Sequence, residues 1–260
     1  MRTAKTVLTV IQERGKQKKP IERVYKLLFN RELYLNAYAK LYPNNGAMTK
    51  GVTNETVDGM SIQKIDRMIE ILREEKYQWK PARREYIKKK NGKKRPLGIP
   101  VWGDKVLQEV MRQILEAYYE PQFSEHSHGF RPNRGCHTAL QEIQVWKGTR
   151  WFIEGDISQY FDTIDHKILL EILARNIHDG RFIRLVSNML EAGYLEEWKF
   201  KQTISGVPQG GVISPILANI YLNEFDNWIE EVLIPKYTKG KRQKSNPEYN
   251  KLTAEIQKLR

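Results

Sequence analysis

The chain has 260 residues, 40% of them apolar, and a formal net charge of +13, so it can bury a substantial core and its charge favours polyanionic partners. Composition alone leaves open the alternative that the charge only keeps a basic protein soluble. The single cysteine, Cys136, excludes an intrachain disulfide, and there is neither a secretion signal nor a run of about 20 apolar residues, so we expect a cytoplasmic protein without membrane contact.

The N-terminal region is expected to be basic and then helical. A basic run occupies residues 15–19, and Pro20 suits the first turn of a helix that continues to about Leu41. A second helix is predicted from Ser61, because apolar residues recur after it at helical spacing. This predicted buried stripe consists of Ile62, Ile65, Ile69 and Leu72.

A basic hairpin is predicted next. Residues 80–95 contain nine Lys or Arg and one Glu, and the dipeptide Asn91-Gly92 is a strong signal for a two-residue turn between strands. Side chains alternate between the two faces of a hairpin, so one face can present cations to phosphates. Alternatively, the lysines only protect a solvated edge from aggregation.

Helices and a short strand follow without a regular alternation. We expect a strand at 151–157 and helices at 104–120, 165–176, 181–191 and 214–233. One side of the first of these helices carries Val106, Leu107, Val110, Met111, Ile114, Leu115 and Tyr118. The absence of a regular strand–helix–strand rhythm predicts the α+β class.

Asp156 lies where the expected strand 151–157 ends. A carboxylate at such a position can bind Mg²⁺, which takes few protein ligands and completes its coordination with substrate phosphates. Two-metal phosphoryl transfer needs carboxylates from more than one segment. Taken alone, such an aspartate is more commonly a turn or cap residue, and we expect Asp165 to be a helix cap.

The segment 205–211 is rich in glycine and precedes the helix that we expect to start at Ser214-Pro215. Glycines on either side of Gln209 allow the backbone to approach a ligand closely, and a helix start nearby favours anions. A glycine-rich turn is weak evidence when it stands alone.

Four motifs in this order resemble the reverse transcriptases of group II intron-encoded proteins. They are Arg95-Pro96-Leu97-Gly98-Ile99-Pro100, Ser127-His128-Gly129-Phe130-Arg131-Pro132-Asn133-Arg134, the run 155–166, and Val207-Pro208-Gln209-Gly210-Gly211 with Ser214-Pro215-Ile216-Leu217-Ala218-Asn219. The resemblance covers roughly residues 34–228. It implies a right-hand polymerase fold, with fingers and part of the palm, and RNA-directed DNA polymerase activity in the complete protein.

The resemblance also implies roles for individual residues. Asp156 corresponds to the first catalytic carboxylate, and the carbonyl of Ile157 to a further ligand of the two Mg²⁺ ions. Phe161 corresponds to an aromatic gate that collides with a ribose 2′-OH and so selects deoxynucleotides.

Nucleotide and RNA contacts follow from the same resemblance. Gln209 lies beside the incoming deoxynucleotide, while Lys89 and Arg95 hold its triphosphate. The residues expected to contact RNA are Lys16, Lys18, Lys19, Lys88, Lys93, Lys94, Arg131 and Arg134. The expected partners are group II intron RNA, an RNA template with a DNA primer, and deoxynucleotides.

The family pattern assigns residues 1–103 to an N-terminal extension and fingers, and 104–260 to part of the palm, with a helical fingers segment near 167–205. The family's Tyr-Ala-Asp-Asp segment and thumb are not found in these 260 residues. We therefore expect part of a longer protein, located in a bacterial cytoplasm or an organelle matrix, that binds RNA without synthesising DNA by itself. An RNA-binding maturase that assists splicing without polymerisation, and a reverse transcriptase of another retroelement, are the alternatives.

Two further groups of residues are interpreted as structural. The spacing of His126, His128, Cys136 and His137 fits no common zinc site, so we expect no metal there and a packing role for His128 and Phe130. Core positions are expected for Trp146, Trp151, Trp198 and Trp228, in preference to base-stacking platforms.

Overall fold

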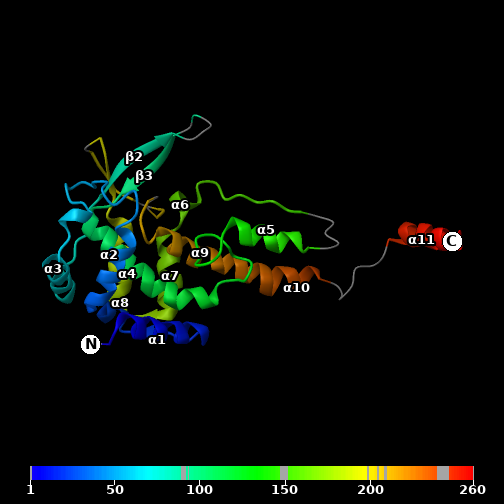
Figure 1. Ribbon diagram of the computed structural model, residues 1–260, viewed down its shortest axis with the longest axis horizontal. Coiled ribbons are helices and arrows are strands. Elements are labelled where there is room, and N and C mark those ends of the chain that lie inside the picture. Colours follow the sequence, from blue (N-terminus) through cyan, green and yellow to red (C-terminus); the bar gives the residue numbers. More distant parts are fainter. Residues whose placement is uncertain are drawn as a thin grey trace. The chain divides into compact units, whose positions relative to one another are not determined.

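The computed structural model describes residues 2–88, 92, 94–146, 152–197, 199–203, 205–207, 210–238 and 246–259. The chain forms two compact units, Met1–Asn223 and Glu224–Arg260. In the first unit, helices pack around one core and a four-stranded sheet lies beside them, which confirms the predicted α+β class (Figure 1). Among the described residues, no helix has the length and apolar character needed to cross a membrane.

The N-terminal region differs from the helix expected between Pro20 and Leu41. Its elements are α1 (Ala4–Lys16), β1 (Ile21–Glu22), the 3₁₀ helix η1 (Val24–Phe29) and α2 (Arg31–Leu41). No helix begins at Pro20, because β1 pairs in parallel with β4 (Ile177–His178), a contact that local sequence patterns do not reveal. Helix α2 begins instead after Asn30, whose side chain accepts a hydrogen bond from the Glu32 N–H at 3.1 Å.

The second predicted helix is α3 (Ile62–Arg73), and it begins where the sequence indicates. Ser61 caps it by accepting a hydrogen bond from the Lys64 N–H at 3.2 Å. The predicted stripe is buried at Ile65, Ile69 and Leu72, but Ile62 is 54% exposed. Ile62 is the first residue of the helix and lies outside the core, so this part of the prediction is wrong.

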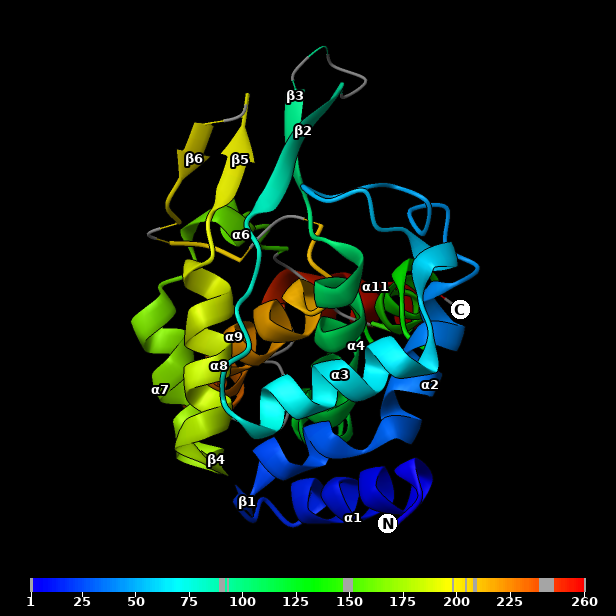
Figure 2. The ribbon, with the colours of Figure 1, turned by 90° about the vertical axis from the view of Figure 1, so that its left-hand side faces the viewer.

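The predicted basic hairpin is present and belongs to a larger sheet. Strands β2 (Ala82–Lys88) and β3 (Lys94–Ile99) are antiparallel, and β5 (Tyr194–Glu196) pairs in parallel with β2. With β6 (Lys199–Lys201), the strand order is β3-β2-β5-β6, and Figure 2 shows the two hairpins standing side by side. A segment about 100 residues later in the chain therefore widens the hairpin.

The register of the hairpin differs from the expected two-residue turn. A turn at Asn91-Gly92 would place Lys88 opposite Arg95, whereas the structure pairs Lys88 with Lys94. Compared with a two-residue turn, the pairing is shifted by one residue, so an odd number of residues connects the paired residues Lys88 and Lys94. Gly92 itself has a φ of +77°, in the region that glycine adopts readily.

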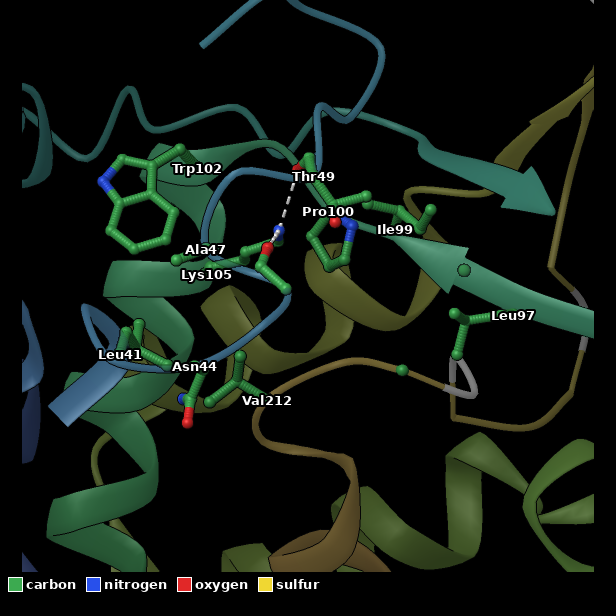
Figure 3. A pocket seen from close by; sticks show the side chains of 13 residues that line it. Leu41, Asn44, Ala47, Thr49, Leu97, Ile99, Pro100, Trp102, Lys105 and Val212 are labelled. Carbon is green, nitrogen blue, oxygen red and sulfur yellow. Dashed lines mark hydrogen bonds between the residues drawn. The ribbon is translucent and has the colours of Figure 1, made fainter. Parts of the chain in front are cut away.

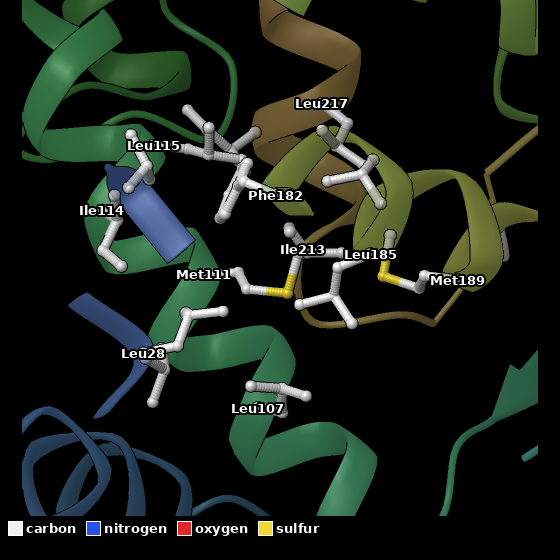
Figure 4. Close-up of a cluster of buried hydrophobic side chains, with 14 of the residues drawn as sticks. Leu28, Leu107, Met111, Ile114, Leu115, Phe182, Leu185, Met189, Ile213 and Leu217 are labelled. Carbon is white, nitrogen blue, oxygen red and sulfur yellow. The ribbon is translucent and has the colours of Figure 1, made fainter. Parts of the chain in front are cut away.

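Helix α4 (Trp102–Tyr119) forms the centre of the core. All seven residues predicted for its buried side are buried, and α1 and α2 pack against it. Figure 4 shows Met111 of α4 facing Phe182 and Leu185 of α8 (Gly180–Glu191), with Leu217 of α9 (Ser214–Trp228) beside them. Each such side chain contributes roughly 1.5–3 kcal/mol when it is fully buried.

The remaining helices follow the predictions closely. Helix α7 (His166–Asn176) is capped by Asp165, whose carboxylate accepts a hydrogen bond from the Ile168 N–H at 3.0 Å. Helix α9 begins at Ser214 itself and continues through the π-helical turn η4 (Ile229–Leu233) into α10 (Ile234–Tyr237), slightly beyond its expected end. The described structure also contains four short elements and one further helix. The short elements are α5 (Cys136–Gln144), α6 (Tyr160–Thr163), η2 (Val57–Gly59) and η3 (Glu120–Gln122), and the helix is α11 (Pro247–Lys258).

Two predictions for the middle and end of the chain are wrong. Residues 152–157 form no strand, since no described segment pairs with them, and a strand needs a neighbour for its backbone hydrogen bonds. Trp146 and Trp228 are 49% and 47% exposed and lie outside the core. Trp151 and Trp198 lie outside the described residues.

Candidate functional site

Asp156 lies on an exposed part of the segment 152–157, directly before the α6 turn. Its carboxylate and the carbonyl of Ile157 are oxygen donors of the kind that Mg²⁺ prefers. Within the described part of the chain, no group of three or more His, Cys, Asp or Glu side chains could hold a metal ion. Around Asp156, the described residues therefore offer these oxygen donors without a complete ligand set.

The α6 turn, which carries Phe161, is joined to the glycine-rich loop. The Val207 N–H donates to the Phe161 carbonyl and the Gly206 N–H donates to the Ile164 carbonyl, both at 2.8 Å. Gly206 has a φ of +89°, and a Cβ there would lie 2.8 Å from backbone atoms of Asp162 and Phe161. Only glycine allows this close contact without displacing the turn.

The same loop also contacts the base of the basic hairpin. A Cβ at Gly210 would lie 2.6 Å from the Gly98 carbonyl oxygen and 2.7 Å from the Leu97 side chain. The Val212 N–H donates to the buried Gln108 side chain at 2.8 Å, which fixes the far end of the loop to α4. Three of the four sequence motifs therefore meet at this loop.

Phe161 is held among aromatic rings. Its ring centroid lies 5.7 Å from that of Tyr160 and 6.3 Å from that of Phe130, and the two contacts are edge-to-face. The Tyr160 hydroxyl donates to the Ala218 carbonyl at 2.8 Å, which fixes the turn to α9. Phe130 is itself 70% exposed, so its expected packing role is limited to this contact.

A small apolar cavity of about 210 Å³ lies where β3, the loop after α2 and Gly210 approach one another (Figure 3). Trp102 and Lys105, at the start of α4, lie at its edge. The Lys105 ammonium donates to the carbonyls of Gly46 and Thr49, both at 3.1 Å, and burial lowers the pKa of this lysine. These bonds hold the loop after α2 against the base of the hairpin.

The expected nucleotide-binding and RNA-binding residues of the hairpin, the glycine-rich loop and the N-terminal region divide into three groups. Lys88 and Lys94 are exposed on the hairpin, and Arg95 is exposed on the face that carries Leu97. Lys89, Lys93 and Gln209 lie outside the described residues. At the end of α1 and after it, a cluster of exposed cations consists of Lys16, Lys18 and Lys19.

Arg131 is the clearest correction to the expected RNA contacts. Its side chain is 4% exposed and pairs with Glu120 at 3.0 Å. It also donates to the carbonyls of Ser124 and Ser127 at 2.6 and 2.8 Å. The guanidinium organises this loop and is not accessible to a phosphate. Arg134 is mostly buried and pairs with Glu125.

Sequence inspection did not identify the partner of the neighbouring histidines. The Glu142 carboxylate binds both His126 and His128, the latter at 2.8 Å, and these bonds lower the pKa of Glu142. The other His128 ring nitrogen hydrogen-bonds the Thr138 hydroxyl at 2.8 Å. His128 is therefore structural, as expected. Glu142 follows Thr138 by one helical turn, which is the only sequence signal for this cluster.

Comparison with known proteins gives a consistent result. Residues 87–241 match the family described as reverse transcriptase (RNA-dependent DNA polymerase). The chain is 47% identical over 239 residues to the group II intron-encoded protein LtrA of Lactococcus lactis subsp. cremoris, a match that covers 91% of this chain and 40% of that protein. It is 36% identical over 93 residues to the nuclear intron maturase 1, mitochondrial, of Arabidopsis thaliana, covering 35% of this chain and 13% of that protein.

A solved structure shares the fold. A chain in a partial Cas6-RT-Cas1–Cas2 complex superposes with a TM-score of 0.53 at 20% sequence identity, over 80% of this chain and 35% of that chain. The polymerase-type fold with fingers and palm is therefore shown for this chain. The chain spans less than half the length of LtrA, of the Arabidopsis maturase and of the structural neighbour.

Proposed function

Because this chain belongs to the reverse transcriptase family of group II intron-encoded proteins, we propose that it carries the nucleotide-binding and RNA-binding part of an RNA-directed DNA polymerase. The observation that supports this most strongly is the junction of three segments. The α6 turn with Phe161, the loop with Gly206 and the base of β3 are joined by close backbone contacts, and the α6 turn follows Asp156 closely in the sequence. Such a junction fixes the relative positions of residues that act on one nucleotide.

The proposed reaction is attack of a primer 3′-hydroxyl on the α-phosphate of a deoxynucleoside triphosphate, with release of pyrophosphate. When bound, two Mg²⁺ ions would polarise the phosphate oxygens and neutralise the developing charge. Asp156 and the Ile157 carbonyl would hold one ion, together with carboxylates outside the described residues. The divalent metal is a general property of the family, and its identity as Mg²⁺ is part of the proposal.

The other residues orient the nucleotide and select its sugar. Arg95 projects from the hairpin and, with Lys89, would neutralise the triphosphate. Phe161 is fixed by Tyr160 and by the loop, so its ring cannot move easily away from a ribose 2′-OH. Gln209 would contact the nucleotide from the loop. Each role rests on family resemblance and is supported by the shared position of the turn, loop and hairpin.

We extend the proposal to domains and partners. Residues 1–103 would form the N-terminal extension and fingers, and 104–260 part of the palm, with 167–205 completing the fingers. The pairing of β5 with β2 supports the last assignment, because it joins 194–196 to the hairpin sheet. The proposed partners are group II intron RNA, a primed RNA template and deoxynucleotides, in a bacterial cytoplasm or an organelle matrix.

The metal assignment is tested in the longer protein that contains the remaining carboxylates. Asp156→Ala should abolish primer extension and leave RNA affinity within a few fold, since Asp156 carries no positive charge to contribute to RNA binding. The Ser158→Ala variant, at an exposed position two residues after Asp156, serves as a control for local structure. Primer extension that survives in Asp156→Ala would overturn the assignment and favour a maturase that acts without polymerisation.

The 260-residue chain provides a second test. We expect it to bind RNA and to show no DNA synthesis, since its described residues contain no group of three or more His, Cys, Asp or Glu side chains that could hold a metal ion. Measurable primer extension by this chain would contradict the proposed division of the active site.

A further inference from the structure

The Phe161 ring contacts an aromatic ring from a distant part of the chain. The centroid of Phe130 lies 6.3 Å from that of Phe161, and the two ring planes are perpendicular, at 90°. Phe130 belongs to the motif of residues 127–134, whose two arginines pair with glutamates of the same region. Its ring is 70% exposed, so the contact with Phe161 lies outside the hydrophobic core.

Both neighbours of Phe130 in the chain are fixed. The Gly129 carbonyl accepts a hydrogen bond from the Asn219 side-chain amide at 2.8 Å, and Asn219 belongs to α9. On the other side, the buried Arg131 guanidinium pairs with Glu120 at 3.0 Å. Between these two anchors, Phe130 has a φ of +55°, a backbone conformation that is uncommon for residues other than glycine. Such a conformation persists where the surroundings impose it, so the fold sets the position of this ring.

Helix α9 fixes the segments of both rings through adjacent residues. The Ala218 carbonyl accepts a hydrogen bond from the Tyr160 hydroxyl at 2.8 Å, and the next residue, Asn219, donates to the Gly129 carbonyl. Each of the two bonded residues, Tyr160 and Gly129, directly precedes one of the two phenylalanines in the chain. A single turn of α9 therefore holds the two phenylalanines close to each other.

A steric gate selects only if its ring resists displacement. A ribose 2′-hydroxyl is rejected to the extent that moving the Phe161 ring costs free energy, because a ring that turns aside accepts both sugars. Phe161 is only partly buried, and its neighbour Tyr160 contacts it at 5.7 Å between centroids. Phe130 adds a contact from another segment, at a distance and angle typical of favourable aromatic pairs.

We propose that Phe130 is a positioning residue for sugar selection, which holds the Phe161 ring and so increases the preference for deoxynucleotides over ribonucleotides. The inference rests on the proposed role of Phe161 as a gate and adds a second residue to it. Phe130 acts through Phe161 and needs no contact with the nucleotide. Asn219 contributes by fixing the backbone directly before Phe130.

The test is primer extension by the longer protein, measured as the ratio of kcat/KM for dCTP to that for CTP. Phe130→Ala should lower this ratio about twofold to tenfold, the effect expected for the loss of one aromatic pair. Phe130→Tyr keeps the ring and should retain the wild-type ratio. The matched control is Phe225→Ala, which removes a ring that is 52% exposed and stacks on Trp228, and it should leave the ratio unchanged.

Other roles of Phe130 give different results. If Phe130→Ala lowers kcat/KM for dCTP and CTP by the same factor, the ring only supports the folding of its loop, and the proposal is overturned. If the ratio is unchanged and the affinity for the primed template falls, the ring contacts nucleic acid, which also contradicts the proposal. A loss of selectivity in Phe130→Tyr as large as in Phe130→Ala would show that the aromatic contact is not the cause.

The coupling between the two rings is tested with a double variant. Because Phe130 acts through Phe161, adding Phe130→Ala to Phe161→Ala should not lower the ratio further. Effects that multiply would show that Phe130 acts independently of the gate. Asn219→Asp has a similar shape, but its carboxylate cannot donate to the Gly129 carbonyl, so it should lower the ratio in the same direction as Phe130→Ala. An unchanged ratio in Asn219→Asp would contradict the anchoring by α9.

The Phe161→Ala variant separates this inference from the proposed function. If Phe161→Ala leaves the ratio unchanged, the gate itself is absent and both fail. If Phe161→Ala lowers the ratio and Phe130→Ala does not, the gate remains and only this inference fails.

Discussion

The contact between Gly206 and the α6 turn allows a quantitative prediction for Gly206→Ala. An alanine at a φ of +89° costs about 1–2 kcal/mol in backbone strain. Its Cβ would also lie 2.8 Å from backbone atoms that cannot rotate away. Either the packing strain costs about 1–3 kcal/mol, or the loop moves and breaks two hydrogen bonds worth roughly 1 kcal/mol each. The free energy of unfolding of the variant should therefore fall by about 2–5 kcal/mol.

Gly92→Ala is the matched control. Gly92 also has a positive φ, +77°, but a Cβ there meets no atom within 4 Å. Only the backbone strain applies, so we expect the free energy of unfolding to fall by about 1–2 kcal/mol. The two variants should differ by about 2 kcal/mol, and the difference reports the contact between the loop and the turn.

The measurement is urea unfolding of the 260-residue chain, followed by far-ultraviolet circular dichroism. With a denaturant dependence of about 2 kcal/mol per molar, the unfolding midpoint of Gly206→Ala should lie about 1 M below that of Gly92→Ala. In the longer protein, Gly206→Ala should also raise the deoxynucleotide KM, because the turn with Phe161 is displaced. Equal midpoints for the two variants would refute the reasoning that this loop fixes the turn.

Three further predictions address the sugar, the phosphates and the effect of pH. In the longer protein, Phe161→Ala should allow incorporation of ribonucleotides, measured as the ratio of kcat/KM for dCTP and CTP, and an unchanged ratio would exclude the gate. Arg95→Glu should weaken the affinity of the 260-residue chain for RNA and flatten its salt dependence, while an unchanged salt slope would place the binding surface elsewhere. Asp104 accepts a hydrogen bond from the Tyr77 hydroxyl, and burial raises the pKa of this aspartate to about 6. A raised acid pKa means stability that is present at low pH and lost as the pH rises through 6, so wild-type stability should gain about 1 kcal/mol from this group between pH 7 and 5. The Asp104→Asn variant should lack this gain, and equal pH dependence of the two proteins by urea unfolding would contradict the prediction.

Local sequence was sufficient where the signal lies within a few residues. Ser61 and Asp165 precede apolar residues at helical spacing, and both cap helices in the structure. The alternation of residues around Asn91-Gly92 predicted the hairpin. The motifs that contain Asp156 and Phe161 indicated the reverse transcriptase family, because the types and order of residues that the chemistry requires are visible in the sequence itself.

Tertiary structure decided the features that depend on distant partners. The parallel pair of Ile21 with Ile177 replaced the helix expected at Pro20, since strand pairing across the fold satisfies the same backbone groups. Arg131 looked like a phosphate ligand but is buried among carbonyl groups of its own loop. A cation in a motif can bind a phosphate or can organise its own loop, and only its burial distinguishes these two roles.

The candidate site shows the same division. The sequence by itself indicated that Asp156, Phe161 and a glycine-rich loop belong to motifs of the reverse transcriptase family, and the family match over residues 87–241 confirms the family. Only the tertiary structure decided that Gly206 contacts the turn with Phe161, and that strands from residues 194–201 extend the hairpin into a four-stranded sheet. The physical reason is that residue types carry the chemistry, whereas close backbone contacts between distant segments arise from the packing of the whole chain.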